Sequence, residues 1–280
     1  MADRPPRRVV SVALDDYQTH LRVHEARGPA AAPVLMLHGI QSHPGWFVGS
    51  AEALAAAGHP VWQFQRRGSG TCTRERGHAR SPRQLLADLD AAVDIVLAES
   101  GADRLHLVGI SWGGKYAACY ALDARRGRRI ESLTLIAPGI ASRVDISWTR
   151  KIAVGLCALA APRRTFAIPL NDSALFTDNP VRREYIRNDP HALKRATASF
   201  LLTSRRMDRL LARASDGAIR PRMNLLLADR DRIIYNDATR AVASRLAGGG
   251  LNVVEFAGAH TLEFELDTAV VFQAMVDAVK

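Results

Sequence analysis

The segment Gly109-Ile110-Ser111-Trp112-Gly113 places a serine between two glycines, directly after an apolar run. It matches the pattern Gly-x-Ser-x-Gly, in which a strand turns sharply into a helix and exposes the serine hydroxyl at the sheet edge. Gly109 and Gly113 leave room for such a turn, and the start of the following helix favours a negative charge. The pattern predicts that Ser111 is a nucleophile; the alternative is a purely structural glycine-rich turn.

A serine hydroxyl needs a general base and an orienting carboxylate to attack a carbonyl near neutral pH. Both residue types occur later in the chain, each at the end of a short apolar run: first Asp229 and Asp231, then His260. Ser, Asp, His is the chain order expected of hydrolases that carry this turn. We therefore predict that His260 is the base and that one of the two aspartates orients it.

Glu263 and Glu265 are alternative acids. They follow His260 closely, and the sequence instead predicts them at the N-terminus of the last helix, about 264–279, where acidic side chains are favourable.

A serine nucleophile also needs two hydrogen-bond donors for the oxyanion that forms during acyl transfer. The backbone N–H of Trp112 is one candidate, and the N–H of Ile40, in the loop "LMLHGIQSHPGW", is the other. His38 and His43 in that loop could instead be metal ligands, but no further ligands occur at a recognisable spacing. The sequence predicts neither a metal nor a cofactor.

The elements that must position these residues alternate along the chain. Uninterrupted apolar runs predict strands buried on both faces, as in a largely parallel sheet; they cover 9–14, 34–39, 61–64, 105–109, 133–139, 224–229 and 252–256. Helical patterns lie between them, most clearly at 81–99, where Ser81, Pro82 and Gln84 form a capping signal. This alternation predicts an α/β fold.

About 80 residues between the runs ending near 139 and starting near 224 have helical character, so they predict an inserted helical subdomain. Its apolar segment "RKIAVGLCALAAPRR" is flanked by basic residues. One interpretation is an interfacial lid helix that makes transient contact with a membrane surface. The other, which we favour because the segment shows no sidedness, is a helix that packs over the active site and lines an apolar pocket.

Composition narrows the function classes. The hydrophobic fraction of 48% and the charged fraction of 24% exclude a disordered chain. The net charge of +10 comes from arginines spread along the whole chain, without a nucleic-acid-binding motif. Three cysteines without paired spacing indicate neither a disulfide framework nor a zinc site.

The N-terminus has too short an apolar run for a secretion signal, and no run approaches the roughly 20 residues of a spanning helix. We expect a cytoplasmic protein.

The chain resembles the α/β-hydrolase superfamily, in particular the branch of monoacylglycerol lipases, lysophospholipases and serine aminopeptidases. The resemblance rests on "LHGIQSHPGW", "RRGSG", "GISWGG", "DRDRI" and "AHTLEFE", in this order. It implies an eight-stranded, mostly parallel sheet with helices on both faces, a core of 1–139 and 222–280, and a helical cap of 140–221.

By the same resemblance Ser111 is the nucleophile, His260 the base and Asp231 the acid, with Ile40 and Trp112 as oxyanion donors. Gln65 departs from the pattern, since such proteins often carry Asp there; we expect an effect on loop packing.

These observations together predict a cofactor-independent serine hydrolase with a small-molecule acyl ester substrate, such as a monoacylglycerol or lysophospholipid. A thioesterase, or an amidase or aminopeptidase, would use the same three residues. A non-catalytic binding module on this fold would not need all three. No nucleic-acid partner is expected, and the sequence does not indicate an oligomeric state.

Overall fold

The computed structural model describes residues 8–280. An eight-stranded sheet has the order β1-β2-β4-β3-β5-β6-β9-β10. The strands are β1 (Arg8–Ala13), β2 (Gln18–His24), β3 (Val34–Leu37), β4 (Val61–Phe64), β5 (Leu105–Ile110), β6 (Ile130–Ile136), β9 (Arg222–Ala228) and β10 (Leu251–Phe256). Strand β2 is antiparallel to both of its neighbours and every other pairing is parallel. The predicted eight-stranded, mostly parallel sheet is therefore confirmed.

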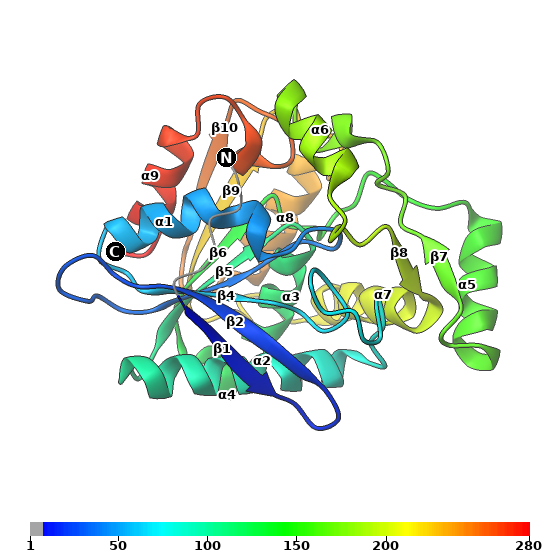
Figure 1. Ribbon diagram of the computed structural model, residues 1–280, viewed down its shortest axis with the longest axis horizontal. Helices are drawn as coiled ribbons and strands as arrows, with labels where there is room; N and C mark the ends of the chain where they lie inside the picture. Colours follow the sequence, from blue (N-terminus) through cyan, green and yellow to red (C-terminus); the bar gives the residue numbers. More distant parts are fainter. Residues whose placement is uncertain (1–7) are drawn as a thin grey trace.

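Helices cover both faces of the sheet (Figure 1). They are α1 (Val48–Ala56), α2 (Pro82–Ser100), α3 (Trp112–Ala121), α4 (Ala124–Gly127), α5 (Trp148–Ala160), α6 (Pro180–Asn188), α7 (Ala198–Arg213), α8 (Asn236–Leu246) and α9 (Ala269–Ala278), with single turns η1 (Pro44–Phe47), η2 (Ser173–Leu175) and η3 (Leu262–Phe264). Helices α1 and α9 pack together above the sheet in Figure 1, and α2 lies below it. Strands β3, β4 and β5 are buried at every position, as their continuous apolar sequences predict.

Helix α2 starts at the predicted signal. The Ser81 hydroxyl accepts from the Gln84 backbone N–H at 3.2 Å, and Gly101 ends the helix with a left-handed conformation. The Gln84 side chain accepts from the Arg80 backbone N–H, so the reciprocal bond is made one residue earlier than in a capping box.

Strand β2 was not among the predicted runs. Its residues alternate between the interior and the surface, with Thr19, Leu21 and Val23 buried. Such alternation is weaker evidence than a continuous apolar run, because polar residues occupy half of the positions.

The residues between β6 and β9, which we call the cap, contain α5, η2, α6 and α7. They also contain a short antiparallel pair, β7 (Thr165–Ala167) with β8 (Arg195–Thr197), that the sequence did not indicate. Figure 1 shows these elements at one side of the sheet, with α5 outermost. The boundaries 140 and 221 stay a prediction.

The last helix was predicted wrongly at its start. Helix α9 begins at Ala269, and residues 262–264 form the separate turn η3. The Glu265 carboxylate accepts from the Ala259 N–H and Phe264 is buried, so the chain stays folded back before α9. Neither Glu263 nor Glu265 therefore lies at the N-terminus of α9.

Residues 1–7, which form part of the N-terminal stretch considered for a secretion signal, lie outside the described residues. Across residues 8–280, no helix combines the length and apolar character that crossing a bilayer requires.

Candidate active site

Ser111 lies in the sharp turn between β5 and α3, in a left-handed backbone conformation with φ 55° and ψ −123°. Such a conformation is strained for a residue with a side chain, and the surroundings must hold it. The Ser111 N–H donates to the Ile136 carbonyl, and its carbonyl accepts from Gly114 and Gly139. A Cβ on Gly109 would lie 2.5 Å from the Gly113 carbonyl oxygen. Glycine is therefore required for the close approach of strand and helix.

His260 contacts both Ser111 and Asp231. Its Nε2 lies 2.8 Å from Ser111 Oγ, and its Nδ1 lies 2.7 Å from Asp231 Oδ2. The other oxygen of Asp231 accepts the N–H groups of Ile233 and Ile234 at 2.7 and 3.0 Å. A carboxylate held in this way accepts a hydrogen bond from Nδ1–H, keeps that proton on the ring and leaves the Nε2 lone pair facing the serine. The arrangement can activate a hydroxyl for attack.

The other candidate acids do not approach His260. Asp229 Oδ1 accepts the Gly258 N–H at 2.8 Å, which ties the ends of β9 and β10 together. Glu263 caps the start of α1, because its carboxylate accepts the Ser50 N–H at 3.1 Å. Burial raises the pKa of Glu263 to about 7, against the opposing effect of the hydrogen bonds from Ser50.

The two predicted oxyanion donors flank the serine. Ile40 lines the cavity beside Ser111, and Trp112 follows Ser111 at the first position of α3. Within residues 8–280, neither backbone N–H donates to a protein acceptor. A Cβ on the adjoining Gly39 would lie 3.2 Å from Ser111 Cβ, so the loop passes directly against the serine. Both N–H groups are available to a bound oxygen.

The two histidines considered as metal ligands have other partners. His38 Nε2 accepts from the Arg66 N–H at 3.2 Å, and its Nδ1 donates to the Gly39 carbonyl at 2.8 Å. Burial, followed by the nearby Arg66 charge, holds the pKa of His38 well below its ordinary value. His43 accepts the Gly45 N–H and contacts Asp189. The side chains are thus used to shape the loop that carries Ile40.

Asp189, at the end of α6, links the cap to this loop, and sequence analysis missed it. Its Oδ2 accepts from His43 Nε2 at 3.0 Å and from Trp46 Nε1 at 2.6 Å. Burial raises the pKa of Asp189, but the hydrogen bonds from His43 and Trp46 outweigh it and hold the pKa at about 2. Close by, the Leu193 N–H donates to the Gln41 carbonyl. The loop is therefore fastened to the cap at two neighbouring points.

The cavity beside Ser111 is small. Trp46 and Phe176 line it together with Ile40, Ser111 and His260. Its volume is about 10 Å³, which is room for about one water. Phe176 belongs to the cap, and its carbonyl accepts the Thr261 N–H at 2.7 Å. The cap is thus bonded directly to the residue that follows His260.

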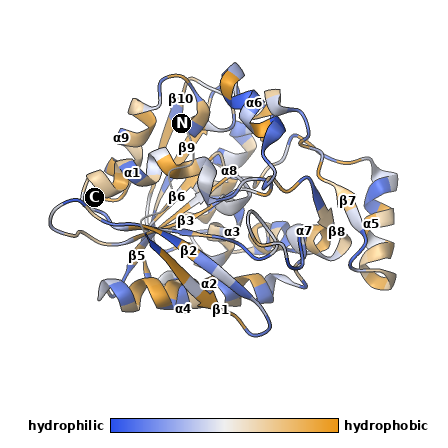
Figure 2. Ribbon diagram, viewed as in Figure 1, coloured by the Kyte–Doolittle hydropathy of each residue, from blue (hydrophilic) through white to orange (hydrophobic). Residues whose placement is uncertain are grey.

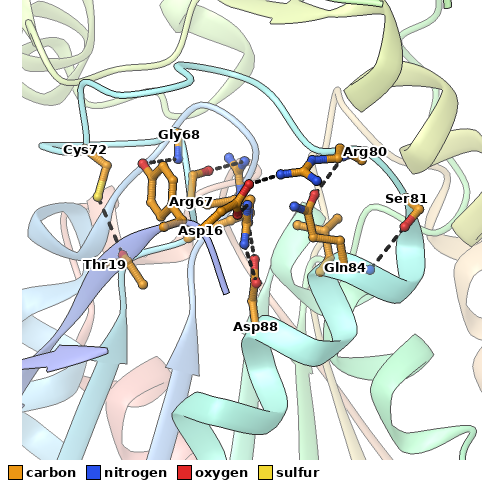
Figure 3. Close-up of polar contacts among 12 residues, drawn as sticks. Asp16, Thr19, Arg67, Gly68, Cys72, Arg80, Ser81, Gln84 and Asp88 are labelled. Carbon is orange, nitrogen blue, oxygen red and sulfur yellow. Dashed lines mark hydrogen bonds and ion pairs between the residues drawn. The ribbon is translucent and has the colours of Figure 1, made fainter. Parts of the chain in front are cut away.

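The loop after β4 lies next to the site and is held in place by side-chain contacts. Gln65 Nε2 donates to Ser69 Oγ at 2.9 Å, so Gln65 contributes to the packing of this loop. Arg67 donates to both oxygens of Asp88 on α2, and Asp16 bridges Arg67 to Arg80 (Figure 3). These contacts fasten the loop to α2 and to the turn between β1 and β2.

The predicted position of the cap's apolar helix was wrong. Within α5 only Val154 is buried, and no α5 residue lines the cavity. Its large apolar side chains are instead exposed, namely Trp148 71%, Ile152 49%, Leu156 64% and Leu159 83%. At 3.6 residues per turn they share one face. Every residue from 152 to 161 is apolar or glycine, so the sequence shows no polar face opposite this one.

A protein-family model described as "Serine aminopeptidase, S33" matches residues 28–267, a range that includes Ile40, Ser111, Asp231 and His260. The chain belongs to this family. This family consists of serine hydrolases with the α/β-hydrolase fold, so the predicted superfamily, fold class and serine-hydrolase class are confirmed.

Curated relatives match part of the S33 protein. "Phospholipase YtpA" of Bacillus subtilis (strain 168) is 27% identical over 154 residues, which are 55% of this chain and 56% of that protein. An uncharacterized abhydrolase domain-containing protein of Dictyostelium discoideum is 25% identical over 166 residues, 59% of this chain and 17% of that protein. The matched region thus spans little more than half of the first relative and a small part of the second.

Solved structures match almost the whole S33 protein. A monoacylglycerol lipase of Paleococcus ferrophilus has a TM-score of 0.81 at 21% identity, covering 92% of this chain and 98% of that one. A soluble variant of monoglyceride lipase from Saccharomyces cerevisiae, in complex with a substrate analog, has a TM-score of 0.85 at 17% identity, covering 99% and 97%. At these identities the likeness shows the shared fold.

Proposed function

We propose that this protein hydrolyses a carboxylic ester of an acyl chain, such as a monoacylglycerol or a lysophospholipid, with Ser111, His260 and Asp231 as its catalytic residues. The observation that carries the proposal is the continuous contact from Ser111 Oγ through the His260 ring to Asp231. The lipase and phospholipase names among its relatives support an acyl ester as substrate.

In this mechanism Ser111 Oγ attacks the carbonyl carbon while His260 Nε2 accepts the hydroxyl proton. The carbonyl oxygen becomes negative and accepts the N–H groups of Ile40 and Trp112. His260 then returns its proton to the leaving alcohol, which departs from the acyl-enzyme. A water molecule then attacks the acyl-enzyme while His260 Nε2 accepts its proton. His260 returns this proton to Ser111 Oγ as the acid is released.

The test is a hydrolysis panel with Ser111→Ala as the blank. It covers p-nitrophenyl esters of several lengths, monoacylglycerol, lysophospholipid, an acyl thioester and an aminoacyl amide. We expect ester hydrolysis by the natural chain, and no labelling of Ser111→Ala by a fluorophosphonate although the variant keeps its fold. Undiminished labelling of Ser111→Ala would exclude the nucleophile, and activity confined to the amide would exclude the ester.

The thioesterase and the amidase or aminopeptidase remain the alternatives, because all of them use the same nucleophile and base. The thioester and amide in the panel separate them from the ester hydrolase. A binding module on this fold predicts that every substrate is left intact.

We also propose that the cap touches a membrane surface through the exposed face of α5. Figure 2 shows α5 at the outer edge of the molecule, and its polar residues lie in the first turn whereas the rest of the helix is apolar. Trp148, Leu156 and Leu159 expose large apolar side chains there, and Arg163 lies just beyond the helix with an exposed guanidinium. An apolar face with basic residues nearby suits the boundary between acyl chains and headgroups.

The membrane proposal predicts that sedimentation with anionic phospholipid vesicles falls several-fold in the double variant Trp148→Ser/Leu156→Ser. Leu266→Ser is the matched control, because Leu266 is as exposed but lies outside the cap. Equal sedimentation of the double variant and the natural chain would refute the contact.

A cytoplasmic location remains part of the proposal. Cys72, Cys119 and Cys157 are free thiols, the state that a reducing compartment maintains. Fractionation of cells that express the tagged chain tests it, and recovery in the secreted fraction would contradict it.

A further inference from the structure

Arg66 is a buried cation without a carboxylate partner. It is 2% exposed, and within residues 8–280 no carboxylate oxygen lies within 4.0 Å of its guanidinium. The guanidinium lies beside two aromatic rings that contact each other, 5.1 Å from the centre of Trp112 and 4.9 Å from that of Phe200. Its Nη2 donates to the Ile40 carbonyl at 3.0 Å, and its Nε has no partner.

The neighbouring Arg67 shows what a buried arginine ordinarily requires. Arg67 is equally buried and donates to both oxygens of Asp88 (Figure 3). Removing a charge from water is costly unless an opposite charge compensates it. Aromatic stacking recovers part of that cost for Arg66, but the positive charge itself is left without a counter-ion.

The position of Arg66 indicates where a counter-charge would arise. Arg66 contacts both proposed oxyanion donors, Ile40 through its carbonyl and Trp112 through its ring. It does not line the cavity beside Ser111, so a substrate bound there would not contact it directly. Burial lowers the pKa of Arg66 to about 10, and the guanidinium therefore stays protonated at neutral pH.

We propose that Arg66 is a positioning residue that holds the Ile40 loop and supplies a fixed positive charge for the oxyanion. The inference rests on the proposed function, since the oxyanion forms only if Ser111 attacks a carbonyl. In the resting enzyme the charge is uncompensated. In the transition state the substrate oxygen becomes negative where it accepts the Ile40 and Trp112 N–H groups. The Arg66 charge is already in place and stabilises this oxygen without reorganisation of the protein. The attraction between the Arg66 charge and the oxyanion acts through protein of low polarity, so solvent screens it only weakly.

The test compares three variants of Arg66. Arg66→Met keeps much of the apolar volume and removes the charge, Arg66→Gln keeps a donor for the Ile40 carbonyl without charge, and Arg66→Lys keeps the charge. The first readout is the rate at which a fluorophosphonate labels Ser111, which requires no knowledge of the substrate. The second readout is binding of an intact ester to the same variants combined with Ser111→Ala, which measures the ground state alone.

We expect Arg66→Met and Arg66→Gln to slow labelling by roughly 10- to 100-fold, less than the loss of an oxyanion donor itself. Arg66→Lys should recover most of the rate. Ester binding in the Ser111→Ala background should stay within about twofold, because the charge acts only once the oxygen is negative.

The matched control is Lys115→Met/Asp208→Asn. Lys115 is also a buried cation near Ser111, but its Nζ lies 2.7 Å from Asp208 Oδ1, so the pair is neutral overall. Its labelling rate should stay within about threefold of the natural chain. A loss equal to that of Arg66→Met would show that any disturbance around α3 suffices and would overturn the proposal.

Two further outcomes overturn it. An Arg66→Gln variant that labels at the natural rate would show that the charge is not needed. An equal loss of ester binding and labelling would make Arg66 a substrate-binding residue. If Arg66→Met fails to fold, the pair Arg66→Lys and Arg66→Gln still separates charge from hydrogen bonding. Undiminished labelling of Ser111→Ala would instead refute the proposed function itself.

Discussion

Asp229 and Asp231 belong to the same turn after β9, but their carboxylates have different partners. Asp231 faces His260 and accepts two backbone N–H groups, whereas Asp229 accepts the Gly258 N–H and is half exposed. Only Asp231 can hold the His260 proton on Nδ1, and this orientation is what general-base catalysis requires. The pair therefore offers a comparison between two acids separated by one residue.

Asp231→Asn should lower kcat for ester hydrolysis by at least roughly 1000-fold, because an amide favours the wrong tautomer of His260. Asp229→Asn should stay within a few-fold of the natural chain. Steady-state kinetics on a p-nitrophenyl ester measure both, with circular dichroism as the check on folding. If the two variants lose the same activity, Asp231 is not the orienting acid.

The residues that follow strands were predictable from sequence, and those whose roles depend on the cap were not. Ser111 and His260 each follow an apolar run, so the parallel topology brings them to one edge of the sheet. From the sequence alone, Asp189 looks like an ordinary turn residue before Pro190. Arg66 looks like one of two adjacent arginines on the surface. Their roles depend on contacts between segments far apart in the chain, which local sequence does not encode.

At the scale of elements, the main contact is between the Ile40 loop and the end of α6. Asp189 holds His43 and Trp46, and the Trp46 ring also packs at 5.2 Å against Phe264, in the turn that follows His260. The cap therefore supports the Ile40 loop and the loop that carries His260 through shared side chains. A change in the cap is expected to reach both loops.

Asp189→Asn should lower the free energy of unfolding by roughly 1–3 kcal/mol at neutral pH, since buried donors lose a charged acceptor. The folded-state pKa of about 2 lies below the ordinary value of roughly 3.9. The stabilisation is therefore complete above pH 4 and is lost as the pH falls toward 2. Urea unfolding at pH 7 and pH 3 measures the difference, and Glu184→Gln on the surface of α6 is the control. A difference that does not shrink at the lower pH would contradict the ionic role.

For the whole molecule, the space beside Ser111 is narrow. A cavity with room for about one water is too small for an acyl chain, so we expect the cap to move before a long-chain ester reaches Ser111. The contacts that must yield include the bond from Thr261 to Phe176 and the bond from Leu193 to Gln41. Both are single backbone hydrogen bonds, which are worth about 1 kcal/mol each.

Phe176→Ala should shift the acyl-length preference toward longer p-nitrophenyl esters, because the Phe176 ring fills the space between Trp46 and His260. The ratio of kcat/KM for a long ester over acetate should rise several-fold. The melting temperature should fall, since removing a buried phenyl ring costs roughly 3–5 kcal/mol. Leu266→Ala, an exposed change beyond the site, is the control. An unchanged length profile would show that Phe176 does not limit access.

The cap connects two strands that are already neighbours. Strands β6 and β9 pair directly in parallel, with Leu133 opposite Met223 and Ile136 opposite Leu226. The long insertion therefore takes the place of an ordinary crossover helix, and no pairing within the eight-stranded sheet depends on its length. Insertions, deletions and exchanges can accumulate in it while β5, β9 and β10 keep Ser111, Asp231 and His260 in place, provided that the contacts of Asp189 and Phe176 with the two loops are kept. Substrate range in such a chain can evolve, or be engineered by a cap graft that keeps these two residues, separately from the chemistry.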